Sequence, residues 1–390
     1  MCDSTQYQVT GTAAQDEQAL IASIASPARP STRPKPKAAK AKQVTVTIAD
    51  EASVATEQVS NEVHTSSVSD VFQEIDKLQD CGINAADLKK LKEAGLHSAL
   101  SVIYTTRKDL CNIKGLSEQK VEKILEAAKK LTDAGFISGV EYARQKSATR
   151  FHVSTGASKV DQLLGGGFES CSITELFGEF RCGKTQLCHA VSVIAQLPQA
   201  LGGANGKVCY IDTENTFRPD RIQAIAAHYN IDANQVLDNI MYARCYTSDH
   251  LVQLLVHVAA KMAEEKFALM IIDSIMGPFR VDFSGRGELA ERQQILSRVM
   301  SRLQKLSEEF NIPVIITNQV MADPAAAMSF AANPPKPVGG HILAHFSTTR
   351  LALRKGRAEQ RIMKIYDSPC LPEGDAIYEI CERGIQDAKE

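Results

Sequence analysis

Gly178-Glu179-Phe180-Arg181-Cys182-Gly183-Lys184-Thr185 lies between an apolar run, 172–177, and a helical pattern, 186–194. This order of strand, glycine-containing loop and helix is typical of a phosphate-binding loop. The glycines let successive backbone N–H groups converge on phosphate oxygens, and the helix N-terminus adds a favourable partial positive charge. We expect Lys184 to contact the outer phosphates of a nucleotide and the Thr185 hydroxyl to bind Mg²⁺.

Further apolar runs end in polar residues in the same way. They cover residues 207–212, 240–244, 267–273 and 313–317. Helical stretches separate them, so the runs predict parallel strands that are buried on both faces and carry functional groups at their carboxyl ends. Runs at 348–354, 361–366 and 376–380 predict more strands that close the sheet. The predicted fold class is therefore α/β, with a central, mostly parallel sheet.

Polar side chains at these strand ends suggest the chemistry. Asp273 ends one strand and is expected to make a second Mg²⁺ contact, opposite Thr185. Glu214 lies just past another strand, where a carboxylate can polarise a water that attacks the γ-phosphate. Gln319 follows a third strand and could contact the γ-phosphate. Either acid alone is typical of a solvated strand end, but several strands that deliver Lys184, Glu214 and Asp273 to one edge predict a hydrolytic site.

Two long loops leave the sheet on the predicted nucleotide side, over residues 280–288 and 320–338. Their basic and apolar side chains include Arg280, Arg286, Met328 and Phe330. Arginines can bind phosphates, and apolar groups can wedge between or stack on bases. Loops of this length are usually functional. DNA binding and a pair of mobile lids are the two interpretations.

The chain is expected to contain more than one domain, because 390 residues exceed the usual size of one core. Residues 1–68 lack periodicity and predict a disordered tail, in which the basic, proline-rich segment 27–42 suits either nuclear import or DNA tethering, or a solvated linker. We expect a small helical domain over 69–132, a linker over 133–150 without a long periodic element, and the nucleotide-binding core over 151–390.

The helical domain contains a turn typical of helix–hairpin–helix motifs, Ile113-Lys-Gly-Leu116. Ser117 could cap the following helix, and Lys120 is expected to point out of its first turn. Such turns present backbone N–H groups to DNA phosphates without reading sequence. They are also common as simple packing elements, and both interpretations stay open.

The composition limits the partners. The 44 basic and 46 acidic residues leave a net charge of −2, so DNA contact must be local. Ten cysteines without a C-x-x-C pair fit free thiols in a reducing compartment. We expect no membrane partner and no signal peptide, because no apolar run approaches the roughly 20 residues that span a bilayer.

The motifs of residues 70–390 resemble those of the eukaryotic RecA-like DNA strand-exchange recombinases, and those of the meiosis-specific branch most. The signposts are 178–186, Ile211-Asp-Thr-Glu-Asn-Thr-Phe-Arg-Pro-Asp-Arg221, 283–289, 339–345 and 366–372. The resemblance implies a nuclear ATPase that forms helical filaments on single-stranded DNA and exchanges strands with a homologous duplex. A ubiquitous repair recombinase, or a mediator paralogue without strand exchange, stays an alternative.

The resemblance also implies residue roles. ATP and Mg²⁺ would contact the loop 178–185 with Gln186, Arg221 would lie against the adenine, and Asp367 and Pro372 would cap the ATP of the neighbouring subunit. Arg280 and Arg286 would lie in the first DNA loop, and Lys336 in the second. Cys182 stands where the family usually has threonine, and Pro335 where a lysine is common.

The segment Gly135-Phe-Ile-Ser-Gly139 resembles the family's assembly motif. Phe136 would dock on the next subunit, and Gly139 stands where the family usually has alanine. The implied receiving surface contains Phe217, Pro219, Met241 and Ala243. The resemblance thus implies a homo-oligomer, filament or ring, together with recombination mediators. The alternative is that Phe136 packs inside its own subunit.

Overall fold

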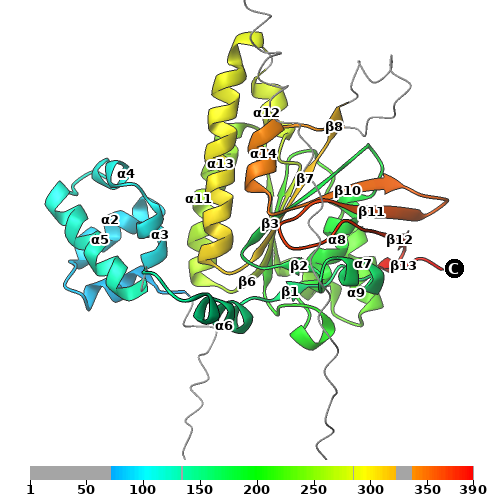
Figure 1. Cartoon of the computed structure of the whole chain (residues 1–390), viewed down its shortest axis with the longest axis horizontal. Coiled ribbons are helices and arrows are strands. Elements are labelled where there is room, and N and C mark those ends of the chain that lie inside the picture. The colour runs from blue at the N-terminus through cyan, green and yellow to red at the C-terminus, as the bar shows by residue number, and fades with distance from the viewer. Residues whose placement is uncertain (1–71, 133–134, 284, 322–335, 390) are drawn as a thin grey trace, which may run out of the picture. The chain divides into compact units, whose positions relative to one another are not determined.

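The computed structural model describes residues 72–132, 135–283, 285–321 and 336–389 (Figure 1). The tail expected over 1–68 and the residues Met328 and Phe330 lie outside the described residues. Within these ranges, no helix is both long enough and apolar enough to cross a membrane.

Short helices make up the first described region. They are η2 (Ile75–Gln79), α2 (Ala85–Glu93), α3 (Ala99–Tyr104), α4 (Arg107–Cys111) and α5 (Glu118–Thr132). Their apolar faces meet in one cluster, in which Leu78, Leu91, Val102 and Ala128 are fully buried. Polar side chains cap the N-termini of several of these helices. For example, the Asn84 side chain accepts a hydrogen bond from the N–H of Ala86, in α2, at 3.0 Å.

The Lys120 side chain, in the first turn of α5, is 49% exposed and pairs with Asp87. Its Nζ donates to both carboxylate oxygens of Asp87, at 3.0 and 2.9 Å, and Lys90 donates to the same carboxylate. The hydrogen bonds from Lys120 and Lys90 lower the pKa of the Asp87 carboxyl. A DNA phosphate at this turn would therefore compete with Asp87 for the Lys120 ammonium group.

The connector also differs from the prediction, because it contains the helix α6 (Gly139–Thr149). The Ser138 hydroxyl caps this helix by accepting from the N–H of Glu141 at 3.1 Å. None of the α6 side chains is buried. Since an unburied helix needs no apolar stripe, the segment lacks the periodicity from which helices are predicted.

The core is built on a nine-stranded sheet in the order β13-β12-β11-β10-β3-β7-β6-β4-β5. The strands are β3 (Ser172–Gly178), β4 (Lys207–Asp212), β5 (Ile240–Arg244), β6 (Phe267–Asp273), β7 (Pro313–Asn318), β10 (Thr349–Lys355), β11 (Gln360–Asp367), β12 (Asp375–Cys381) and β13 (Gly384–Asp387). The strands from β10 to β5 run parallel, and β11, β12 and β13 continue the sheet antiparallel. The predicted α/β class with a mostly parallel sheet is confirmed.

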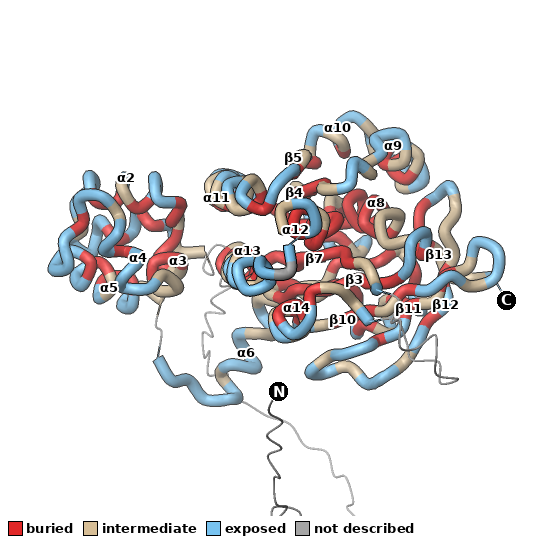
Figure 2. The backbone as a smooth tube through the Cα atoms, turned by 90° about the horizontal axis from the view of Figure 1, so that it is seen from above, coloured by how far each residue is buried: buried red, intermediate tan, exposed pale blue. Residues whose placement is uncertain are grey.

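Helices cover both faces of this sheet (Figures 1 and 2). One face carries α7 (Ser158–Leu163), α8 (Lys184–Ile194), α9 (Pro219–His228) and α10 (Ala233–Asp238). The other carries α11 (Ser248–Glu264), α12 (Gly277–Asp282), α13 (Leu289–Glu309) and α14 (Gly340–Phe346). Neighbouring side chains of β4 divide between the two clusters, with Tyr210 on the first and Cys209 and Ile211 on the second. This division explains why the strand reads as a continuous apolar run.

Small elements complete the core. They are β1 (His152–Val153), β2 (Phe168–Glu169), η3 (Gln199–Leu201), η4 (Arg286–Glu288), β8 (Val320–Met321) and β9 (Lys336–Pro337). The stretch 280–288, expected as a loop, is largely helical, because α12 begins at Gly277 and η4 follows it. Val281 is 75% exposed, so this short helix shows no clear apolar face in the sequence.

Candidate nucleotide-binding site

The phosphate loop connects β3 to α8. Gly183 has a φ of 99°, in the left-handed region that favours glycine, and it directly precedes the first residue of α8. Gly178 is required for a different reason: a Cβ there would lie 2.2 Å from the carbonyl oxygen of Leu353. These two positions let the loop curl tightly between the strand and the helix, as the sequence predicts.

The Lys184 side chain folds back over this loop. Its Nζ donates to the carbonyl oxygens of Gly178 and Glu179, at 2.9 and 3.0 Å, and lies 3.6 Å from the sulfur of Cys182. Cys182 is buried, and its burial raises the pKa of the thiol. The cysteine therefore presents a neutral group beside the ammonium ion. Lys184 lies where it can exchange loop carbonyls for phosphate oxygens.

Thr185 and Asp273 meet as expected. The Thr185 hydroxyl donates to Oδ2 of Asp273 at 2.7 Å, and the Tyr210 hydroxyl donates to the same oxygen at 3.0 Å. Thr317 donates to the other carboxylate oxygen. Burial of Asp273, which is 3% exposed, raises the pKa of its carboxyl despite these bonds. A hydroxyl beside a carboxylate is a donor set that suits Mg²⁺, and the cation would favour the charged carboxylate.

Glu214 and Gln319 also come together, at the same edge of the sheet. Oε1 of Glu214 accepts hydrogen bonds from Nε2 of Gln319 at 2.6 Å and from the Ser274 hydroxyl at 2.7 Å. The side-chain oxygen Oε1 of Gln319 accepts a hydrogen bond from the guanidinium of Arg280. Arg280 thus belongs to the end of α12, in contact with a predicted site residue, rather than to an isolated loop.

A cavity of about 720 Å³ opens over these groups, a size that can hold a nucleotide. Besides residues 178–186 its lining includes Glu214, Thr216, Arg221, Asp273, Ser274, Thr317, Gln319, Arg361 and Cys381. Arg221 donates to Oε1 of Gln186 at 2.8 Å and to the carbonyl oxygen of Glu382 at 2.6 Å. It therefore lies at the rim between α9 and the β12–β13 turn. Its predicted contact with the adenine stays a prediction.

The residues predicted to cap a neighbour's ATP lie elsewhere. Asp367 ends β11 and Pro372 lies in the following turn; both are exposed, and neither lines the cavity. This separation is compatible with a role toward another subunit, which stays a prediction.

The predicted DNA residues are described in part. Arg286 begins η4, and Lys336 is the first residue of β9, which pairs with β8 at the base of the second loop. Val338 donates its N–H to the carbonyl oxygen of Gln319 at 3.0 Å and so closes this base. The second loop thus starts and ends next to a residue of the candidate site.

Among the predicted assembly residues, Phe136, Gly139 and Pro219 are exposed, and Phe217, Met241 and Ala243 are half-buried. Phe136 has an exposure of 110%, so it does not pack inside its own subunit. Gly139 is the first residue of α6, and a Cβ there would meet no atom within 4 Å. The receiving residues Phe217, Pro219, Met241 and Ala243 lie around β5 and the start of α9.

Three residues of the site are not predicted by the sequence patterns. Tyr210 and Thr317 hold Asp273, and Ser274 holds Glu214. Ser274 and Thr317 adjoin predicted strand ends, a signal that could have found them. Tyr210 lies inside an apolar run, where only packing reveals which buried hydroxyl meets a carboxylate.

Comparison with known proteins identifies the family. Residues 145–388 match the Rad51 family. The chain is 60% identical over 322 residues to the meiotic recombination protein DMC1/LIM15 homolog of Homo sapiens, covering 82% of this chain and 94% of that protein. It is 56% identical over 320 residues to the meiotic recombination protein DMC1 homolog B of Oryza sativa subsp. japonica, covering 82% and 92% of the two chains. It is 55% identical over 322 residues to the meiotic recombination protein DLH1 of Candida albicans, covering 82% and 99%.

These relatives do not favour the repair recombinase or the mediator paralogue that the sequence alone left open. The chain belongs to the Rad51 family, as a strand-exchange recombinase of its meiotic branch.

Proposed function

We propose that this recombinase is a DNA-dependent ATPase, which binds ATP with Mg²⁺ to assemble a filament on DNA and hydrolyses ATP to release it. The observation that carries the proposal is the 2.7 Å hydrogen bond between Thr185 and Asp273, beside the phosphate loop. Phosphoryl transfer needs such a pair to position a divalent cation. The neighbouring pair of Glu214 and Gln319 supplies groups for the attacking water.

Thr185 and Asp273 would hold Mg²⁺, with Asp273 acting through water. Held there, Mg²⁺ would supply positive charge that offsets the negative charge of the phosphates. Lys184 would leave its two carbonyl acceptors for the phosphates, because hydrogen bonds between two ionised groups are stronger. The loop N–H groups and the α8 N-terminus would hold the remaining phosphate charge.

Glu214 would orient the water and accept its proton, as a general base within hydrogen-bond reach must. Its Oε1 already accepts hydrogen bonds from Gln319 and Ser274. Among the contacts of the described residues none involves Oε2, so this oxygen is available to the water. Gln319 would orient the carboxylate in the resting state and turn toward the γ-phosphate when ATP binds.

DNA binding would affect ATP hydrolysis through Arg280. The guanidinium of Arg280 contacts Oε1 of Gln319, and Nε2 of Gln319 contacts Glu214. A DNA phosphate that bound Arg280 would replace the neutral carbonyl with an anionic acceptor, and Gln319 would be free to reorient. We propose that both single-stranded and double-stranded DNA bind here, with Arg286, Met328, Phe330 and Lys336 as further contacts.

The same proposal includes self-assembly through Phe136, which would bury its ring on the surface around Phe217 and Met241 of the next subunit. A phenylalanine ring that leaves water contributes roughly 1.5–3 kcal/mol at each interface. A nuclear location follows from action on meiotic chromosomes, and loading by recombination mediators is expected for a filament of this kind.

The test compares Glu214→Gln with Glu264→Gln, in which the exchanged residue is exposed at the end of α11 and pairs with Lys261. ATP binding and hydrolysis are measured separately, with and without single-stranded DNA, followed by strand invasion into a homologous duplex. Loss of a general base costs roughly 10²–10⁴-fold in rate. We expect Glu214→Gln to bind ATP, hydrolyse it slowly and hold DNA longer, and Glu264→Gln to behave as the parent. Normal turnover in Glu214→Gln would remove its assigned role.

A further inference from the structure

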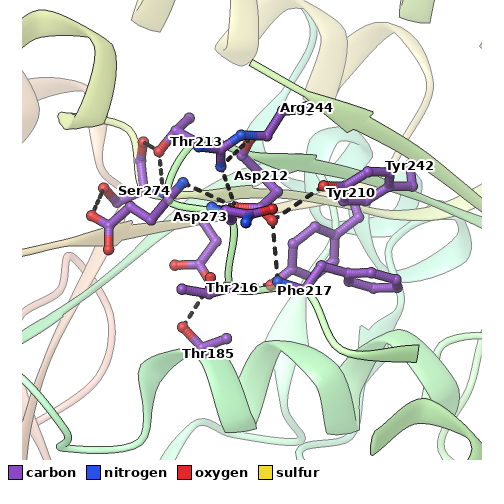
Figure 3. A network of polar contacts seen from close by, with 12 residues as sticks. Thr185, Tyr210, Asp212, Thr213, Thr216, Phe217, Tyr242, Arg244, Asp273 and Ser274 are labelled. Carbon is purple, nitrogen blue, oxygen red and sulfur yellow. Dashed lines mark hydrogen bonds and ion pairs between the residues drawn. The ribbon is translucent and has the colours of Figure 1, made fainter. Parts of the chain in front are cut away.

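Asp212, the last residue of β4, is a fully buried carboxylate at the centre of a polar network (Figure 3). Its oxygens accept backbone N–H groups from Glu214 at 2.9 Å, Asn215 at 2.7 Å and Phe217 at 3.1 Å. Nη1 of Arg244 donates to it at 3.1 Å. A buried carboxylate needs hydrogen-bond partners, and these N–H groups supply them. Asp212 is thus the group around which the loop 213–217 folds.

This loop carries Glu214. Asn215 has a φ of 62°, so the chain turns sharply directly after Glu214. On the far side of the turn, the carboxylate of Glu214 meets Ser274 and Gln319. Because Asp212 accepts hydrogen bonds from the N–H groups of Glu214 and Asn215, its position determines the backbone position of Glu214, from which the catalytic side chain extends.

On its other side Asp212 contacts Tyr242, which lies on β5 between Met241 and Ala243 of the predicted docking surface. The hydroxyl of Tyr242, on β5, donates to Oδ2 of Asp212 at 3.3 Å, and Tyr242 is 42% exposed. The ring of Phe217 lies 5.0 Å from that of Tyr242 and 4.9 Å from that of Tyr210. The Tyr210 hydroxyl in turn contacts Asp273. Two short paths therefore lead from the surface of β5 to the site, one through Asp212 to Glu214 and one through the rings to Asp273.

We propose that Asp212 is a positioning residue that links the β5 surface to Glu214, so that a segment docked on this surface changes nucleotide affinity within the same subunit. The inference rests on the proposed function, in which Phe136 of a second copy docks there. A docked ring against Phe217 and Tyr242 restricts their movement, and the Tyr242 hydroxyl passes the restriction to Asp212. A ligand shifts a site only through such a difference in contacts between states.

The experiment uses the full-length Phe136→Glu protein, which cannot supply its own docking ring, and a synthetic peptide with the sequence of residues 133–146. The affinity for a non-hydrolysable ATP analogue with Mg²⁺ is measured with and without saturating peptide. The peptide affinity is then measured with and without the analogue. Because coupling between two binding sites is reciprocal, both ratios must agree, and we expect a factor of about five or more.

Asp212→Asn then tests the link, with Asp238→Asn at an exposed position of α10 as the matched control. An asparagine amide cannot accept hydrogen bonds on its nitrogen, so some N–H groups lose their partner. We expect the coupling factor to fall below about two in Asp212→Asn and to stay unchanged in Asp238→Asn. Tyr242→Phe removes only one hydroxyl and keeps the ring, so this variant tests the link even if Asp212→Asn does not fold. We expect its coupling factor to fall as well.

The possible outcomes distinguish failure of the docking surface from failure of the link through Asp212. A peptide that fails to bind overturns the docking surface itself, and this inference with it. A peptide that binds without changing nucleotide affinity overturns only the link. Full coupling in both Asp212→Asn and Tyr242→Phe overturns the assigned role of Asp212.

Discussion

Arg350→Met should strongly destabilise the core, because it leaves a buried carboxylate without its charged partner. Nε of Arg350, on β10, donates to Oε2 of Glu175 on β3 at 2.7 Å; the two residues are 6% and 0% exposed. Nδ2 of Asn318 donates to the other oxygen at 2.7 Å and to the carbonyl oxygen of Val338 at 2.7 Å. The guanidinium also lies 5.3 Å from the centre of the Tyr366 ring. The pair thus joins two strands to the base of the second loop.

The expected magnitude follows from burial. Removing one partner of a buried ion pair costs about 3–5 kcal/mol, since the remaining charge is neither solvated nor paired. In a domain of about 150–250 residues each kcal/mol shifts the melting temperature by about 2–4 °C, so we expect a drop of about 6–20 °C. Methionine keeps a similar apolar volume and limits the effect to the lost charge.

Thermal melting of three variants checks this reasoning. Arg354→Met, at an exposed position of the same strand, is the control and should change stability by less than about 0.5 kcal/mol. Arg350→Met combined with Glu175→Leu should recover most of the loss, because replacing both members of a buried pair with apolar residues is often neutral. A loss below about 1 kcal/mol in Arg350→Met, or no recovery in the double variant, would refute the account.

Four further predictions concern the site, the surfaces and pH. Lys184→Ala should abolish ATP binding, measured by equilibrium dialysis, because the outer phosphates lose the Lys184 ammonium group; retained affinity would contradict this. Arg286→Ala should weaken binding to unrelated single strands alike and lower the salt slope of log affinity by roughly 0.7 per lost phosphate contact, whereas an unchanged slope would exclude such a contact. Phe136→Glu should dissociate oligomers in light scattering without lowering the melting temperature; persistent oligomers would exclude Phe136 as the link. Burial lowers the pKa of His189 from 6.5 to about 4, so the unfolded chain binds the proton first and stability should fall as pH drops from about 6.5 to about 4; His189→Leu should reduce this pH slope in chemical unfolding, and an unchanged slope would assign it to other groups.

Patterns within short segments predicted most of the core. The strands β4, β5 and β6 have the predicted bounds, because each is a compact apolar run with polar residues at its end. The helix α6 was missed, since a helix that buries none of its side chains shows no apolar stripe. The helix α12 was missed because its six residues span too few turns for a period to be visible. β13 was missed as well, because a strand of four residues offers too few positions for a period to be visible.

The sequence by itself determined the phosphate loop, the chemistry of Thr185, Asp273 and Glu214, and the family resemblance, because these depend on residue types at fixed local spacing. Only the tertiary structure decided which groups meet. Thr185 and Asp273 are 88 residues apart along the chain, and Glu214 and Gln319 are 105 apart. Their contacts follow from the strand order β3-β7-β6-β4, which brings distant carboxyl ends to one edge. The central place of Asp212 was likewise decided by folding, because its partners come from β5 and the loop 213–217, and no local pattern specifies how those elements pack.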